Sequence, residues 1–142
     1  MRVVGFAPSR KALIEDAGGV TAEGFPMTSC YVDGFPAQLT VPLVIAVYTQ
    51  GGTDYEPRRY IIATSPDGDR VGSLEFAWNW PDNPGSPFKY RVFAQHLPMT
   101  AQFAGVYTIG LYESPGQKET DVVFPLPVHR LNPLMPPAAA SR

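Results

Sequence analysis

The sequence predicts an all-β fold, an antiparallel two-sheet β-sandwich of about eight short strands with an immunoglobulin-like pattern. Three observations predict it. The chain carries 16 prolines and 13 glycines, and proline interrupts helix interiors. These residues stand mostly between apolar runs, as turns between short strands require. Several of those runs alternate apolar and polar residues with the period of two that a half-buried strand needs.

The overall composition indicates one globular domain. The chain has 142 residues, of which 44% are hydrophobic, and its net charge is −2. Its basic residues form no dense patch, which disfavours nucleic-acid binding. No apolar run approaches the ~20 residues of a membrane span, and the first apolar stretch is too short for a signal peptide. We therefore expect a cytoplasmic protein without a membrane partner, or a virion protein if a phage encodes it.

The N-terminal part is predicted as short pieces. Residues 1–9 are interpreted as an N-terminal arm or first strand, and residues 10–16 as either a strand or one helical turn. A strand is expected over 27–32, between two Gly-Phe-Pro tripeptides at 24–26 and 34–36. Proline drives the preceding residue into extended backbone. Each tripeptide is therefore interpreted as a bend, a buried aromatic and an extended exit.

The middle of the chain predicts three longer strands. Residues 41–48 are almost wholly apolar, as in a central sandwich strand. A strand over 59–64 leads into a turn at 65–69, where Gly68 can take the left-handed conformation. Residues 71–80 then alternate. The apolar side chains that share one face of this strand are Leu74, Phe76 and Trp78.

Three further strands complete the predicted sandwich. In the strand over 105–112, Tyr107 follows a Gly-x-Tyr pattern like that of the penultimate immunoglobulin strand, where the hydroxyl closes a bond to the backbone. The last strand, 121–128, holds two prolines, so this end is expected to be an edge or to leave the sheet. The strand over 88–97 also alternates. Its apolar parity, expected to be the packed face, contains Phe88, Tyr90, Val92 and Ala94.

These elements assign residues 10–128 to one sandwich domain. Residues 129–142 form a Pro/Ala-rich tail that should be mobile on its own. Residues 1–9 and this tail are the segments expected to make contacts between subunits. The tail side chains expected to make them are Leu131, Leu134 and Met135.

Four segments also carry a resemblance to a known family. They are residues 15–19, 31–37, 65–69 and 97–107. They resemble small bacterial β-sandwich proteins, frequent in actinobacteria, whose function is unknown. The resemblance covers 10–128 and implies a β-sandwich, with no known activity and no functional residues.

The residue types that carry catalysis or bind metals do not form a recognisable site. Cys30 is interpreted as a small buried hydrophobe. His96 and His129 lack the spacing of a metal site, and Asp67 and Asp69 lack the other ligands of a calcium loop. We expect no metal, no cofactor and no catalytic residue, and therefore a protein that is not an enzyme.

The aromatic residues around one polar loop are the best candidates for contact with a partner. Trp78 and Trp80 fall on one strand face, and Phe88 and Tyr90 follow the loop that contains Asn83. Trp78 is interpreted as core and Trp80 as a cap on the end of the sandwich. Exposed aromatics can instead anchor a protein partner or stack on a sugar. The expected contact residues here are Trp80, Asn83, Phe88 and Tyr90.

The sequence leaves three hypotheses for function. The first is a non-catalytic structural or interaction module, a homo-oligomer or a subunit of a larger protein assembly. Immunoglobulin-like domains decorate phage virions and bacterial surfaces, an analogy at the level of fold. The second is a carbohydrate or small-ligand binding module that uses the Trp78–Tyr90 region. The third, a hydrolase, lacks any visible catalytic constellation.

Overall fold

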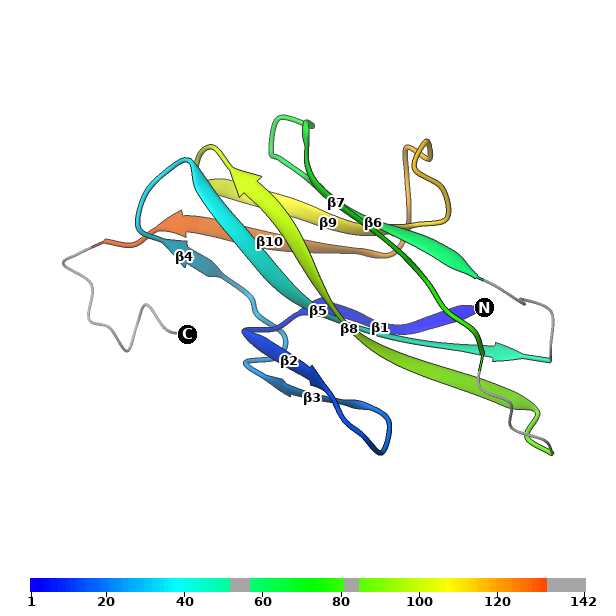
Figure 1. Ribbon diagram of the computed structural model, residues 1–142. Helices are drawn as coiled ribbons and strands as arrows, with labels where there is room; N and C mark the ends of the chain where they lie inside the picture. Colours follow the sequence, from blue (N-terminus) through cyan, green and yellow to red (C-terminus); the bar gives the residue numbers. More distant parts are fainter. Residues whose placement is uncertain (52–56, 81–84, 133–142) are drawn as a thin grey trace.

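The computed structural model describes residues 1–51, 57–80 and 85–132, and all of its regular elements are strands (Figure 1). The prediction of an all-β fold is therefore confirmed. Within these ranges no helix is long and apolar enough to cross a membrane. The strands are β1 (Arg2–Pro8), β2 (Lys11–Ile14), β3 (Val20–Glu23), β4 (Cys30–Val32), β5 (Ala37–Gln50), β6 (Arg58–Thr64), β7 (Arg70–Ala77), β8 (Phe88–Ala101), β9 (Gly105–Tyr112) and β10 (Val123–Arg130).

Eight of these strands form one large curled sheet, in the order β1-β5-β8-β7-β6-β9-β10-β4, and β2 and β3 form a separate hairpin. The long strands β5 and β8 pair antiparallel from Ala37 to Gln50. β8 and β7, in contrast, share a single paired position, Gly72 opposite Met99. The sheet curls at this narrow junction, so that β5 and β8 share one core with β6, β9 and β10 (Figure 1).

The core lies on the inner face of this curl. Alternate residues of β5 and β8 point into it and meet alternate residues of β9. Full burial of one such aliphatic side chain contributes about 1.5–3 kcal/mol. The buried side chains of these three strands include Val41, Leu43, Ile45 and Val47 in β5, Phe93, Leu97 and Met99 in β8, and Tyr107, Ile109 and Leu111 in β9.

The strands predicted over 41–48, 59–64 and 105–112 are confirmed, because β5, β6 and β9 cover them. The strand predicted over 71–80 is confirmed only as far as Ala77, where β7 ends. The turn at 65–69 is confirmed as well. Gly68 has a φ of 89°, and its N–H donates to the Ser65 carbonyl oxygen at 2.9 Å. The N–H groups of Asp67 and Asp69 donate to Ser65 Oγ at 3.3 and 3.2 Å. The two aspartates are thus part of a turn.

The prediction for the packed face of β8 was wrong. The structure buries the opposite parity, which includes Phe93, Leu97 and Met99. β8 continues to Ala101, and its whole length pairs with β5 in a register that turns these odd-numbered residues inward. A shift of one residue in phase moves every side chain to the other face. Phe88, Tyr90, Val92 and Ala94 therefore lie on the outer face of the sheet.

The N-terminal part differs from the prediction in two ways. The ambiguous segment 10–16 contains strand β2, and the prediction missed its partner β3. The strand expected over 27–32 is shorter and is represented by β4 alone. Phe35 packs against the core, as the buried-aromatic interpretation requires. Phe25, which follows β3, does not, and it is 50% exposed.

The last strand lies partly at an edge, as its prolines require. β10 pairs with β9 from Val123 to Val128 but with β4 only from Val128 onward. Within the described chain, Pro125 and Pro127 therefore have a strand partner on one side only. β10 continues beyond the expected end of the domain to Arg130, and the Leu131 N–H donates to the Val32 carbonyl oxygen at 2.6 Å. The rest of the predicted tail, residues 133–142, lies outside the described residues.

Tyr107 makes the backbone bond that the sequence predicts. Its hydroxyl donates to the Phe103 carbonyl oxygen at 2.7 Å, and the side chain is fully buried. Removing one partner of a buried hydrogen bond leaves the other unsatisfied, at a cost of about 1–3 kcal/mol. We expect Tyr107→Phe to lower the free energy of unfolding by about this amount. Urea denaturation measures it.

Tyr112→Phe is the matched control for Tyr107→Phe. Tyr112 is also nearly buried in β9, but its hydroxyl makes no hydrogen bond within the described part of the chain. Its loss should therefore change the free energy of unfolding by less than about 0.5 kcal/mol. Equal losses from the two variants would contradict the assigned role of Tyr107.

Candidate functional site

The aromatic residues expected to make contacts divide between two faces of the large sheet. Trp78 is 5% exposed and stacks on Phe76, with ring centroids 5.5 Å apart, so it belongs to the core. Trp80 is half-buried, lies edge-on to Trp78 and packs against the same core. Both indole Nε1 atoms are buried, without an acceptor among the described residues. Trp80 is therefore turned inward, and it does not share a face with Tyr90.

Phe88 and Tyr90 come together on the outer face with a third aromatic, Tyr48. Tyr48 lies directly opposite Tyr90 in the β5–β8 ladder, and their ring centroids are 5.7 Å apart. Phe88 lies 5.9 Å from Tyr48, edge to face. Tyr90 is 60% exposed. We call Tyr48, Phe88 and Tyr90 the aromatic patch.

The outer face beside the aromatic patch is uncharged. Ala46 lies opposite Val92 and Val44 lies opposite Ala94, and all four are half-buried. The first charged neighbour is Arg2 of β1, which is exposed and lies directly opposite Tyr48. Arg2, Tyr48 and Tyr90 thus form one row across three strands, with the cation at its border.

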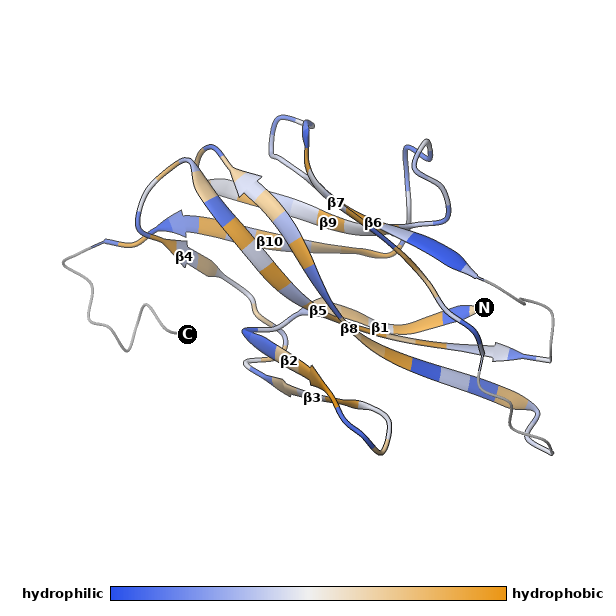
Figure 2. Cartoon of the chain, in the orientation of Figure 1, coloured by the Kyte–Doolittle hydropathy of each residue, from blue (hydrophilic) through white to orange (hydrophobic). Residues whose placement is uncertain are grey.

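The β2–β3 hairpin stands out from the large sheet (Figure 1). β2 contacts β5 and β8, β3 contacts β8, and Ala12 is almost completely buried. The next two residues, Leu13 and Ile14, are 53% and 64% exposed. Figure 2 shows the end of β2 in the colour of strongly hydrophobic residues. The exposed Glu15 and Asp16 follow. We call Leu13, Ile14, Glu15 and Asp16 the hairpin tip.

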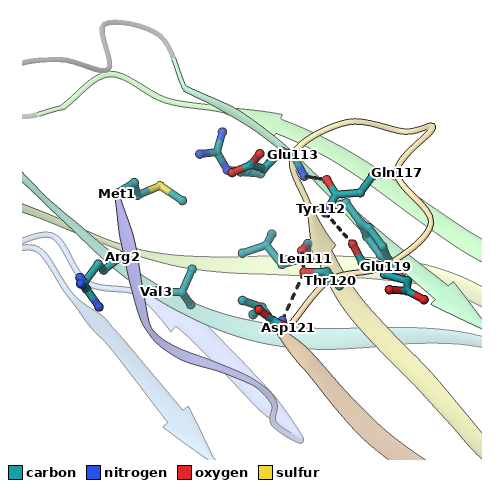
Figure 3. Close-up of a pocket in the computed structure, with 12 residues that line it drawn as sticks. Met1, Arg2, Val3, Leu111, Tyr112, Glu113, Gln117, Glu119, Thr120 and Asp121 are labelled. Carbon is teal, nitrogen blue, oxygen red and sulfur yellow. Dashed lines mark hydrogen bonds between the residues drawn. The ribbon is translucent and has the colours of Figure 1, made fainter.

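A groove of about 830 Å³ lies between the start of β1 and the connection from β9 to β10 (Figure 3). The connection is fixed by a Thr120 hydroxyl that donates to the Leu111 carbonyl oxygen at 2.7 Å. Another bond runs from the Glu113 N–H to Gln117 Oε1 at 3.1 Å. The side chains that line the groove include apolar Val3, Leu111 and Val122, basic Arg59, and acidic Glu113, Glu119 and Asp121.

The groove has the size of a small-ligand site, which is about 300–1,000 Å³. Its described lining contains no His, Cys or Ser, and the groups there that could transfer a proton are the carboxylates of Glu113, Glu119 and Asp121. It can hold a polar group between opposite charges.

The other chemistry-bearing side chains lie apart from one another. Cys30 packs against the core, and burial raises the pKa of its thiol, which keeps the thiol protonated at neutral pH. His129 is exposed and lies 5.6 Å from the ring of Tyr31. His96 is exposed on the outer face, opposite Pro42. In the described ranges, no three His, Cys, Asp or Glu side chains are grouped as metal ligands.

The remaining predicted contact residues are only partly described. Leu131 is half-buried, beside the end of β4. Asn83, Leu134 and Met135 lie outside the described residues. The sequence did not identify Tyr48 as a contact residue. The feature that could have indicated it is its position among the residues of an apolar strand that point outward.

No family model matches this chain, and comparisons with curated proteins and with solved structures found no significant match. The resemblance to small bacterial β-sandwich proteins therefore stays a prediction.

Proposed function

We propose that this domain is a non-catalytic binding module, a subunit or accessory of a larger protein assembly, and that the aromatic patch is its contact surface. One observation carries this proposal. Tyr90 is 60% exposed in a cluster of three aromatics that continues into an uncharged sheet face. Aromatic residues are enriched and charged residues depleted at the centres of protein interfaces. Large apolar patches on soluble domains usually have a partner.

The composition of β5 supports the same conclusion. Residues 41–48 form a nearly continuous apolar run, and such runs are typical of strands covered on both faces. The inward parity packs in the core, and the hairpin covers part of the outward parity through Ala12. Around Tyr48, no described element covers that face. A partner would complete the coverage.

The edges of the large sheet favour contact through a face over strand addition. β4 is only three residues long. β1 has an irregular register between Val3 and Gly5, and the open edge of β10 carries Pro125 and Pro127, which lack an N–H. Short strands, bulges and prolines are the devices by which natural sheets prevent pairing at their edges. The partner would therefore bind on the outer face of β5 and β8.

The proposal includes an immunoglobulin-like sandwich as the finer description of the fold. Two features support it: the curl at Gly72 opposite Met99, and the hydroxyl bond of Tyr107 at the start of β9, which resembles a tyrosine corner. Domains of this type commonly serve as surface modules, an analogy that adds no functional residue.

A photoreactive side chain on the patch tests the proposed contact. p-Benzoylphenylalanine replaces Tyr90 in one variant and Lys118, an exposed residue of the β9–β10 connection, in the control. Both are expressed in the native cellular background and irradiated. We expect a protein adduct from position 90 and none from position 118. Absence of an adduct at position 90, or equal yields at both positions, would overturn the proposal.

A carbohydrate-binding module is the second candidate, favoured by the exposure of Tyr90 beside Tyr48, with ring planes tilted by 38°. Aromatic faces stack on the apolar faces of sugars. This candidate no longer includes Trp80, which is turned inward. Two results together would support carbohydrate binding: position 90 yields no protein adduct, and a neutral oligosaccharide changes the fluorescence of the patch tyrosines.

A further inference from the structure

We propose that the partner on the aromatic patch is a second copy of this chain, which places its β2–β3 hairpin tip on the patch. This inference rests on the proposed function and names its partner. The exposed apolar side chains of the described chain include Tyr90 of the aromatic patch and Leu13 and Ile14 of the hairpin tip. As successive residues of β2, Leu13 and Ile14 point to opposite faces of the hairpin. Both surfaces are apolar, and the charged residues beside them are of opposite sign.

The hairpin is held firmly at its base, while its tip stays exposed. An isolated two-stranded hairpin is marginally stable, but this one is tied to the rest of the domain. The Ser9 N–H donates to the Pro42 carbonyl oxygen at 2.9 Å, and the Arg10 N–H to that of Glu23 at 3.0 Å. Leu13 and Ile14 are therefore presented in a defined position. Such preorganisation lowers the entropic cost of binding.

Charge complementarity favours the second copy as occupant. The hairpin tip ends in Glu15 and Asp16, whereas the patch is bordered by Arg2. The Glu15 carboxylate accepts a hydrogen bond from the Thr21 hydroxyl. The Asp16 carboxylate makes neither a hydrogen bond nor an ion pair within the described part of the chain, so it is available to Arg2 of another molecule. The acidic tip would be repelled by a nucleic acid or an anionic membrane.

A dimer with a two-fold axis would bury the aromatic patch and the hairpin tip of both copies at once. In an isologous dimer each copy donates its hairpin tip and receives the tip of the other, so the same contact is made twice. The patch and tip contain far fewer residues than the roughly 20–30 per side of a standard interface. We therefore expect a dimer that dissociates on dilution.

Sedimentation equilibrium of the full chain over a concentration series is the test. The wild type should show a monomer–dimer equilibrium. Tyr90→Glu and Ile14→Glu should each raise the dimer dissociation constant at least tenfold, while Lys118→Glu, on a remote loop, should leave it unchanged. Arg2→Glu and Asp16→Arg should each weaken dimerisation. Their equimolar mixture should restore it, because each copy then meets its opposite charge.

The charge exchange keeps the test decisive even if one apolar variant fails to fold, since Arg2 and Asp16 are both exposed. A wild type that stays monomeric at every concentration overturns the inference. A dimer that responds to none of the four patch and tip variants also overturns it. If the chain is monomeric but position 90 crosslinks to another protein, only the second copy is excluded and the proposed function stands. If the chain stays monomeric and position 90 crosslinks to no protein, both the dimer and the proposed function are contradicted.

Discussion

Phe93→Ala should lower the free energy of unfolding by about 3–5 kcal/mol, whereas Tyr90→Ala should change it by less than about 1 kcal/mol. Phe93 is 5% exposed, and its ring lies 4.9 Å from Trp78 and 5.3 Å from Phe76. Its removal opens a cavity beside Phe76 of β7 and Trp78, which directly follows β7 in the chain. Tyr90 lies three residues away on the opposite face and loses mainly surface contacts.

Urea denaturation followed by tryptophan fluorescence measures both variants, because Trp78 reports on the environment of Phe93. Phe93→Leu is the graded control, since it keeps most of the buried volume and should cost less than alanine. A larger loss from Tyr90→Ala than from Phe93→Ala would mean that β8 packs with the other parity. That result would also remove the aromatic patch from the surface.

Gly72→Ala should be the most damaging conservative change in the sheet, with a loss of about 3 kcal/mol or more. Gly72 forms the single paired position between β7 and β8. A Cβ at this residue would lie 2.5 Å from the Pro98 carbonyl oxygen and 2.7 Å from Met99 Cβ. Backbone atoms cannot move aside as a flexible side chain can, so the junction has to open.

Gly116→Ala is the matched control, because a Cβ there would meet no atom within 4 Å. It should change the free energy of unfolding by less than about 0.5 kcal/mol. Thermal unfolding by circular dichroism compares the two variants. A melting temperature for Gly72→Ala equal to that of Gly116→Ala would show that β7 and β8 do not meet at this position.

The strands that the sequence predicts well are those whose signal is local. β5 and β9 have strong apolar or alternating runs between turn residues, and the Gly68 turn has its own chemistry. The inward face of β8 depends instead on its pairing with β5, a long-range contact. Phe93 and Leu97, the apolar residues on the otherwise polar parity of the predicted strand, were the available signal. β3 was missed because four residues between glycines carry too short a pattern.

The candidate site was predictable in part. Phe88 and Tyr90 were identified as contact residues, but the sequence placed them with Trp80. The structure places them with Tyr48, which antiparallel register alone brings beside Tyr90. Trp80 turns inward because Trp78 and the other core aromatics offer it apolar surface. The hairpin tip could not be recognised, since a helical turn and a strand fit residues 10–16 equally well.

Light-induced capture of protein by a photoreactive residue at position 90 tests most directly whether this domain acts through its aromatic patch. The account predicts a covalent protein adduct from position 90, whether with a second copy or with another protein, and none from position 118. A position 90 that stays unreacted, or that reacts no more than position 118, would contradict it.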